Sequence, residues 1–476
     1  MLNWGKLISI TGTSQVIVQA VGFASGILVI RLLTVQEYAF YTLANTMLGA
    51  MSLLSDGGIS TGVLAQGGKV WKDKKKLGKV LVTGLNMRKK FGVISLVVSL
   101  PILFYLLIHN GASWLTSFLI IISVIPAFFA TLSDALLEIP LKLNQSILPL
   151  QKNQILVSFG RLLLLCITIF IFPFAYLSIL SGGIARIYGN IKLKKITNHF
   201  ADSSESENPV VKKEISKIVK RSLPGLIYFC FSGQISTWII SFFGNAASIA
   251  QIGALGRISS VLGVILLIFS TLIVPRFARI QNQPNKLLQL YIKIVIAFVI
   301  FSLFIIGFSY LFSNQILWVL GKNYQGLNNE LILLLIATTI TMVMASAYSL
   351  YLSRGWIINY YISISASLLP IILGCFLFEI STLKGVLYLN ILVALVQMIV
   401  HVFYGYFKIL KSKKDYKLIR KPIARIDIPD KVNGKTEFGL DKRVPGMLFA
   451  AVERNPRMRG KVLSFDDTDA MKIPGV

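Results

Sequence analysis

Apolar residues occur along most of the chain in runs of about twenty, separated by short connections rich in lysine, arginine, glycine and proline. A helical run of that length spans the hydrocarbon core of a bilayer. The pattern therefore predicts an all-α polytopic membrane protein with about twelve transmembrane helices. The predicted spans are 7–33, 38–57, 91–108, 114–137, 154–173, 174–191, 222–243, 251–275, 290–312, 331–353, 357–378 and 384–407.

A polar interruption divides these spans into two groups of six. The segment from Asn198 to Pro209 is rich in serine and acidic residues, which is typical of a linker. We therefore predict an N-terminal six-helix lobe over 1–195, a cytoplasmic linker over 196–221 and a C-terminal six-helix lobe over 222–410.

Hydrophobic spans cease near Tyr416, and the rest of the chain has a different character. Residues 423–476 combine glycine and proline punctuation with strand-like pieces such as Met447 to Val452. These features predict a short soluble C-terminal fragment of α/β type.

The charge of the chain follows the same organisation. The net charge is +28, which in a soluble protein would indicate nucleic acid as a partner. Here the basic residues gather in alternate connections, with the largest group between Lys69 and Lys90. The positive-inside rule then places both termini and these connections in the cytoplasm. No aromatic interleaving or binding motif accompanies the basic residues, so we expect no nucleic-acid partner.

Candidate chemistry for catalysis is sparse. Cys166, Cys230 and Cys375 lie inside apolar runs at no metal-ligand spacing, and there is no glycine-rich nucleotide loop. We therefore expect no metal, no cofactor, no catalytic residue and no enzymatic activity.

Short motifs recur in order along the membrane part. Arg31-Leu32-Leu33 precedes Glu37-Tyr38, and Ser55-Asp56-Gly57-Gly58-Ile59-Ser60 ends the second span. In the second half the motifs are Ser222-Leu223-Pro224, Val274-Pro275 and Leu320-Gly321-Lys322-Asn323-Tyr324. Over about residues 1–415 this order resembles the oligosaccharide flippases of the multidrug/oligosaccharidyl-lipid/polysaccharide exporter superfamily. The resemblance implies a MATE-like fold, with two pseudo-symmetric lobes around a cavity that opens alternately to either side of a bacterial inner (plasma) membrane.

The function that this resemblance implies is the movement of a lipid-linked oligosaccharide, a polysaccharide or O-antigen repeat unit, from the inner to the outer leaflet. Its implied partners are the lipid-linked glycan, membrane lipid and other polysaccharide-assembly proteins. The alternative within the superfamily is a cation-coupled drug or metabolite antiporter, which would be expected to carry a carboxylate at mid-depth. No acid in this sequence is predicted to lie at mid-depth.

The C-terminal segment resembles a different family. Arg425-Ile426-Asp427, Asp430 to Lys435, Pro445 to Val452 and Pro474-Gly475-Val476 are similar to the hammerhead start of the molybdopterin-binding subunit of the xanthine dehydrogenase and aldehyde oxidase family. The similarity stops before the part of that family that holds the cofactor. We therefore expect a truncated, non-catalytic fragment, and its origin as a natural fusion or an artefact stays open.

The candidate cations of a substrate site are Arg257, Arg161 and Arg31. Arg257 is predicted about two turns into its helix, with no acid on that helix or on the preceding one. A flat guanidinium suits bidentate contact with phosphate oxygens, and cavity arginines of flippases are thought to meet the pyrophosphate. Snorkelling of Arg257 to the interface is the alternative. Arg31, at the outer end of the first span, is either a second such cation or an interface anchor.

The charged residues of the fourth and fifth spans form a second group. Asp134 and Glu138 are four residues apart and share one helix face. Arg161 is predicted roughly 10 Å deep, level with Asp134. The group either lines the inner cavity or forms a structural ion pair. Asp56, Asp134 and Glu138 are the acids near membrane depth and the candidates for ion coupling.

Three glutamines complete the set of candidates. Gln15 and Gln19 lie four apart on the first span, and Gln234 lies midway along the seventh. Their amides are expected either to line the cavity and contact sugar hydroxyls or to join packed helices.

Overall fold

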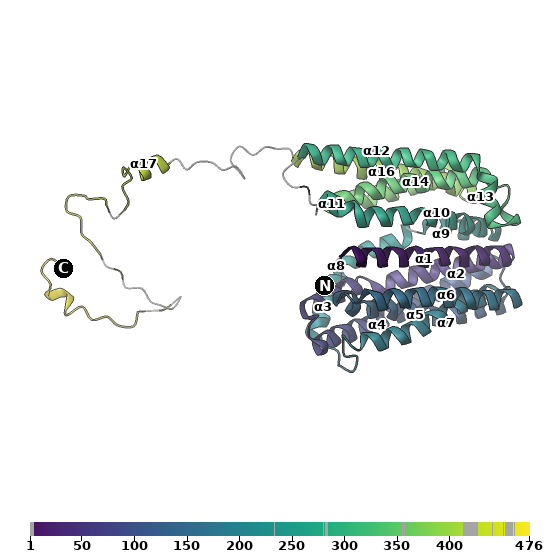
Figure 1. The fold of residues 1–476 in the computed structure, drawn as a ribbon, viewed down its shortest axis with the longest axis horizontal. Helices are drawn as coiled ribbons and strands as arrows, with labels where there is room; N and C mark the ends of the chain where they lie inside the picture. Colours follow the sequence, from purple (N-terminus) through teal and green to yellow (C-terminus); the bar gives the residue numbers. More distant parts are fainter. Residues whose placement is uncertain are drawn as a thin grey trace. The chain divides into compact units, whose positions relative to one another are not determined.

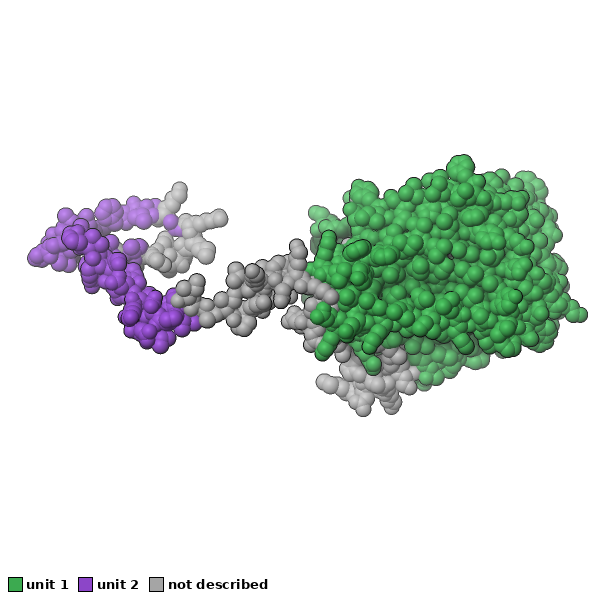
Figure 2. All heavy atoms as spheres, turned by 90° about the horizontal axis from the view of Figure 1, so that it is seen from above, with its two compact units in different colours: residues 1–413 green, residues 414–476 purple. Residues whose placement is uncertain are grey.

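The computed structural model describes residues 4–232, 234–278, 280, 284–354, 356, 358–412, 427–439, 441–450, 452, 460 and 462–476. The chain divides into two compact units, residues 1–413 and residues 414–476 (Figure 2). Every regular element in the described residues is a helix, which confirms the predicted all-α class.

Seven helices form what we call the N-terminal set (Figure 1). Local sequence determines where several of them begin: Thr34, Asp73 and Ser113 each accept a backbone hydrogen bond from the first turn that follows them. The helices are α1 (Trp4–Leu32), α2 (Val35–Asp56), α3 (Ile59–Val70), α4 (Lys74–His109), α5 (Trp114–Leu143), α6 (Ile147–Ile171) and α7 (Ala175–Thr197).

The helices that follow form the C-terminal set. They are α8 (Pro209–Ser232), α9 (Ile235–Phe243), α10 (Ala246–Leu272), α11 (Val274–Ala278), α12 (Pro284–Leu311), α13 (Ser313–Leu320), η1 (Lys322–Tyr324), α14 (Asn328–Leu352), α15 (Tyr360–Leu377) and α16 (Leu383–Ser412). The predicted seventh span, 222–243, is therefore not one helix, because α8 and α9 are separate and Gln234 lies between them.

Among the described residues, eight helices are long and apolar enough to cross a membrane, namely α1, α4, α5, α6, α10, α12, α14 and α16. The apolar stretch of α15 is shorter, and α2, α7 and α8 carry more polar residues. Together with α9, these helices correspond in position to the predicted spans. The first unit is thus a membrane-embedded helical bundle.

Helix α4 extends well beyond its predicted span of 91–108. Its 36 residues correspond to about 54 Å, whereas a hydrocarbon core is only about 30 Å thick. Arg88, assigned from the sequence to a connection, instead lies on this helix and is 5% exposed. Its Nη1 is 3.6 Å from Oδ1 of Asp56. The interpretation of Arg88 as a loop charge was wrong.

Part of the packing pattern is repeated in the two sets. In the N-terminal set α7 packs on α5 and α6, and in the C-terminal set α16 packs on α14 and α15. A hydrogen bond repeats as well: the hydroxyls of Ser52 and Thr131 lie 3.1 Å apart, and so do those of Ser259 and Thr338. These equivalences agree with the predicted pseudo-symmetry. Both sets belong to one compact unit, so the exact lobe boundaries stay a prediction.

The two sets also contact each other. Helix α2 packs on α8 and α10, and α1 packs on α10 and α13. One buried apolar cluster contains Tyr41 from α2, Leu255 from α10 and Leu320 from α13. This cluster surrounds the residues that make up the candidate site.

The second unit contains α17 (Ile428–Val432) and η2 (Ala470–Lys472) in its described part. No strand occurs there, so the predicted α/β type was wrong for these residues; Ala451 of the expected strand lies outside them. None of the described side chains in this unit is buried, and Leu463 is 96% exposed. Because a stable domain needs a buried core, the described part has no basis for independent folding.

Candidate functional site

The centre of the candidate site is the contact between Arg161 and Tyr41. Nη2 of Arg161 on α6 donates a hydrogen bond to the hydroxyl of Tyr41 on α2 at 3.2 Å. Tyr41 is 1% exposed, and Nε of Arg161 is buried with no hydrogen-bond partner among the described residues. Because α6 begins at Ile147, Arg161 lies about 20 Å along the helix and not at the predicted 10 Å.

Arg257 approaches the same hydroxyl from the C-terminal set. Its guanidinium interacts with the hydroxyls of Tyr38 and Tyr41. Its side chain packs on α1 at Gly26, where a Cβ would lie 3.3 Å from Cδ of Arg257. Helix α10 begins at Ala246, so Arg257 lies about 16 Å along it, deeper than predicted. Packing against α1 and α2 argues against snorkelling.

Tyr41 therefore lies between one arginine from each helix set. No described carboxylate forms an ion pair with Arg161 or with Arg257. Arg161 is hydrogen-bonded to a phenol hydroxyl and Arg257 lies near two of them, and phenols are weak partners for a full positive charge. Such an arrangement leaves hydrogen-bonding capacity for an anion.

A cavity of about 210 Å³ opens beside Tyr41 within the N-terminal set. It is smaller than the roughly 300–1,000 Å³ typical of sites for drug-sized ligands, so it suits part of a larger head group. No carboxylate is among the described residues that line it. The polar groups on its wall come from Asn45, Thr131, Ser158, Arg161, Ser178 and Arg186.

Arg186 on α7 was missed in the sequence. Its Nε is 3.6 Å from Oδ2 of Asp134, so Asp134 pairs with Arg186 and not with Arg161, the partner in one of the two interpretations from the sequence. The signal was present, because Arg186 is a single arginine inside an apolar run of small and aliphatic residues. Asp134 thus contributes to the site indirectly, by holding one of the cations of the cavity wall.

Glu138 and Gln15 are joined in a network between helices. Glu138 is 9% exposed, contacts Nζ of Lys142 at 2.7 Å and accepts a hydrogen bond from Gln154 at 2.8 Å. The amide of Gln15 donates to Oε1 of Gln154 at 2.9 Å. This chain of contacts links α1, α6 and α5, as expected for polar contacts that join packed helices. Gln19 is exposed on α1.

The remaining candidates do not gather at Tyr41. Asp56 accepts hydrogen bonds from the backbone of Gly58 and Ser60 at the end of α2 and pairs with Arg88. Arg31 donates from Nε and Nη2 to the carbonyls of Val319 and Trp318, at 2.9 and 2.7 Å.

Arg31 thereby satisfies the carboxyl-terminal end of α13, where a cation is favourable. Gln234 is exposed between α8 and α9. Within the described residues, no group of three histidine, cysteine or acidic side chains is placed to hold a metal ion.

The comparison with curated proteins finds two short matches, and no family model matches the chain. The chain is 45% identical over 67 residues to the isoquinoline 1-oxidoreductase subunit beta of Brevundimonas diminuta. It is 41% identical over 68 residues to a membrane-bound aldehyde dehydrogenase (pyrroloquinoline-quinone) of Gluconacetobacter polyoxogenes. Each match covers 14% of this chain and 9% of the other protein. Both matches are to oxidoreductases, but they are too short to show a family.

The solved structures that resemble the chain cover most of its length. An inward-facing multidrug resistance MATE family transporter of the MOP superfamily has a TM-score of 0.68 at 18% identity, over 83% of this chain and 96% of that one. The outward-facing form has a TM-score of 0.58 at the same identity, over 86% and 97%. A MOP superfamily transporter from Pyrococcus furiosus has a TM-score of 0.55 at 17% identity, over 86% and 97%. The helical bundle of this chain therefore has the fold of the MATE transporters of the MOP superfamily, which are transporters and not enzymes.

Proposed function

We propose that the protein flips a lipid-linked oligosaccharide from the inner to the outer leaflet by alternating access. The observation that carries this proposal is the convergence of Arg161 and Arg257, from different helix sets, on the hydroxyl of Tyr41. Two guanidiniums without carboxylate partners among the described residues suit the oxygens of a pyrophosphate. A site for an organic cation would instead require an available carboxylate.

The transport problem is the desolvation of the head group. A charged pyrophosphate with its hydroxyl-rich glycan loses water on entering the bilayer, at a cost of many kcal/mol. Arg161, Arg257 and the side chains of Asn45 and Ser158 replace that water. The prenyl chain needs no such replacement, because it can stay in the lipid throughout.

Binding and movement are coupled in this proposal through Tyr41. A pyrophosphate that engages Arg161 and Arg257 competes with the Tyr41 hydroxyl for both guanidiniums. Loss of those contacts weakens the packing of α10 on α2. This packing must weaken before the two helix sets can move relative to each other. A ligand shifts a conformational equilibrium only through such differential contacts.

Two observations on similar proteins support the proposal. The resembling MATE structures include an inward-facing and an outward-facing form. The Pyrococcus furiosus transporter is described as having a binding pocket of reverse polarity, which suggests a different function for that protein. In this chain the described cavity wall is cationic, with Arg161 and Arg186 and no carboxylate.

The test is genetic complementation in the host. Deletion of the gene should cause lipid-linked glycan to accumulate on the inner leaflet, and the full chain should restore surface glycan. Arg257→Ala and Arg161→Ala should each lower restored surface glycan at least tenfold, since a hydrogen bond to a charged group contributes about 1.5–3 kcal/mol. The matched control is Arg443→Ala in the C-terminal unit, which should complement fully.

Two outcomes would contradict the proposal. Normal surface glycan in the deletion strain would exclude the flippase function, and altered sensitivity of that strain to organic cations would favour the antiporter alternative. Full complementation by both Arg257→Ala and Arg161→Ala would remove the arginine pair from the site. A chain ending near Lys417 should complement as well as the full chain if the C-terminal unit has no role in transport.

A further inference from the structure

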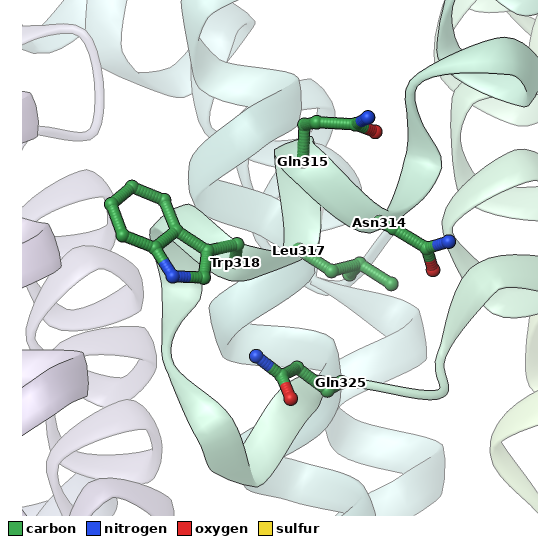
Figure 3. Close-up of a pocket in the computed structure, with 5 residues that line it drawn as sticks. All are labelled: Asn314, Gln315, Leu317, Trp318 and Gln325. Carbon is green, nitrogen blue, oxygen red and sulfur yellow. The ribbon is translucent and has the colours of Figure 1, made fainter.

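A second cavity lies at the short helix α13, apart from the arginine site. Its volume is about 450 Å³, within the range of small-ligand sites. It is lined by Asn314, Gln315, Leu317, Trp318 and Gln325 (Figure 3). The motif Leu320 to Tyr324 begins at the last residue of α13 and takes no part in the arginine site.

The helix geometry brings the polar side chains to one place. Asn314, Gln315 and Trp318 follow one another within a little more than one turn of α13. Gln325 follows the turn η1 and lines the same cavity. Figure 3 shows the three amides and the indole on different sides of Leu317, which is fully buried.

The indole of Trp318 is exposed but held in place. It is 63% exposed, although an aromatic ring of that size is favourably buried. The guanidinium carbon of Arg31 lies 5.0 Å from the ring centroid, and Arg31 also donates to the backbone carbonyl of Trp318. At Gly321, whose φ is 109°, an added Cβ would lie 3.4 Å from Cγ of Arg31, so this turn fits closely around the arginine.

The three amides are free to bind a ligand. Asn314, Gln315 and Gln325 are exposed, and their side chains make no hydrogen bond to any other described residue. Each amide offers two donors and an acceptor, the combination that pairs with sugar hydroxyls. No carboxylate lines the described cavity, so nothing in it selects a cation.

We propose that this cavity binds neutral sugar rings of the transported glycan, with Trp318 stacking on a sugar face and the three amides contacting its hydroxyls. Pockets of this kind combine an aromatic surface with a few placed polar groups. The cavity lies at the end of the bundle opposite the lysine-rich connections, which the charge pattern predicts to be outside the cell. It would hold the glycan as the head group leaves the arginine site, so the inference rests on the proposed function.

The exposure of Trp318 has a second explanation, which an experiment must distinguish from sugar binding. Tryptophans are enriched at both membrane interfaces, so Trp318 could serve as an anchor in the head-group region. Trp114 at the start of α5 is the internal comparison, because it is 74% exposed at the same end of the bundle and packs edge-on against Phe104. Trp71 is a second comparison, since Lys72 lies 5.4 Å from its ring at the lysine-rich end.

The test measures sugar binding by the full chain in nanodiscs, using maltotetraose and chitotetraose as soluble probes in calorimetry. The wild type should bind at least one probe. Trp318→Ala and Gln325→Ala should each weaken binding at least tenfold, whereas Trp114→Ala and Trp71→Ala should leave it unchanged. Gln325 is exposed on a loop, so its variant keeps the test decisive if the change at Trp318 impairs folding.

The failures of this inference and of the proposed function are distinguishable. Arg257→Ala should keep sugar binding while it lowers surface glycan at least tenfold. The inference is overturned if neither probe binds, if Trp318→Ala binds normally, or if Trp114→Ala loses as much binding as Trp318→Ala. A third outcome is that sugar binding depends on Trp318 but deletion of the gene leaves surface glycan normal. That result would support the sugar-binding cavity and contradict the flippase function.

Discussion

The two helix sets share part of their packing but differ in their interiors. In the N-terminal set, charged pairs lie among the helices: Arg88 with Asp56, Arg186 with Asp134, and Lys142 with Glu138. In the described C-terminal set Lys384 pairs with Glu330 between α16 and α14, and the buried polar side chains are serines, Thr339 and His401. His401 shares a 2.6 Å hydrogen bond with the Tyr351 hydroxyl and lies against the ring of Tyr348.

This difference teaches that a repeated fold does not repeat its chemistry. Helix packing needs complementary shapes, and both sets supply them where α7 packs on α5 and α6 and where α16 packs on α14 and α15. Ion pairs at bilayer depth are costly and persist where a function or a structural partner requires them. The C-terminal set contributes Arg257, and that arginine interacts with tyrosines of the N-terminal set. The candidate site is thus built mainly on one set and completed by the other.

The largest expected effect concerns the buried ion pair of the N-terminal set. Asp56→Ala leaves Arg88 without its partner, and removing one member of a buried pair costs about 3 kcal/mol. The apparent unfolding temperature in detergent should fall clearly. The control is Glu330→Gln in the C-terminal set. Nζ of its partner Lys384 lies 3.7 Å away, and the Lys384 side chain is 55% exposed. Because water can solvate Lys384 when Glu330 is gone, the change should cost less than about 1 kcal/mol. Equal shifts for both variants would refute the contrast between the sets.

The next effect tests the contact between the sets. A Cβ at Gly253 of α10 would lie within clash distance of Oγ1 and 3.2 Å from Cβ of Thr42 on α2. Gly253→Ala should therefore force the helices apart at a cost of about 1–3 kcal/mol. Cross-linking of cysteines placed on α2 and α10 should become less efficient. Gly256→Ala on the same helix has open space and should leave cross-linking unchanged; a similar loss in both variants would contradict the expectation.

A smaller effect is expected at the hydroxyl that joins the sets. Tyr41→Phe removes the group that both Arg161 and Arg257 approach, and transport measured as surface glycan should change about tenfold. The matched control is Tyr324→Phe, because the Tyr324 hydroxyl is buried without a hydrogen-bond partner among the described residues. Loss of the Tyr324 hydroxyl should leave the free energy of unfolding unchanged or raise it slightly. Tyr41→Phe with wild-type transport would remove the hydroxyl from the mechanism.

The smallest effect lies in the C-terminal set. Tyr351→Phe deletes the hydroxyl that contacts Nδ1 of His401, and one neutral hydrogen bond contributes about 1 kcal/mol. The unfolding temperature should fall slightly, and transport should be unchanged because the pair lies outside the arginine site. A transport loss as large as that of Arg257→Ala would show that the C-terminal set carries functional chemistry of its own.

Hydropathy predicted the fold well where a helix is apolar and poorly where it is not. The first turns of α4 are rich in lysine and lie beyond the apolar slab, so the predicted span began only at residue 91. The break between α8 and α9 was not predicted, because the apolar run continues across it. The strand expected from Met447 failed because apolar alternation needs a partner strand and a core, which the described tail does not have.

Prediction of the site had a similar limit. Arg161 and Arg257 were selected because an arginine inside an apolar run needs a partner or a function. Their common neighbour, Tyr41, has no such signal, since a tyrosine near a helix end is ordinary at a membrane interface. A pair between Asp134 and Arg161 was one of two interpretations and depended on their predicted depths alone. Because α6 begins earlier than predicted, Arg161 lies at a different depth.

The sequence alone determined that the chain crosses a membrane many times, where most spans lie and which arginines are anomalous. These properties follow from local hydrophobicity and from the cost of burying charge, which need no knowledge of neighbours. Only the tertiary structure decided that Arg161 and Arg257 meet at Tyr41, that Arg31 contacts the end of α13, and that three amides and Trp318 line one cavity. Those contacts join residues far apart in the chain, and their geometry depends on helix phase and packing, which hydrophobic periodicity does not specify.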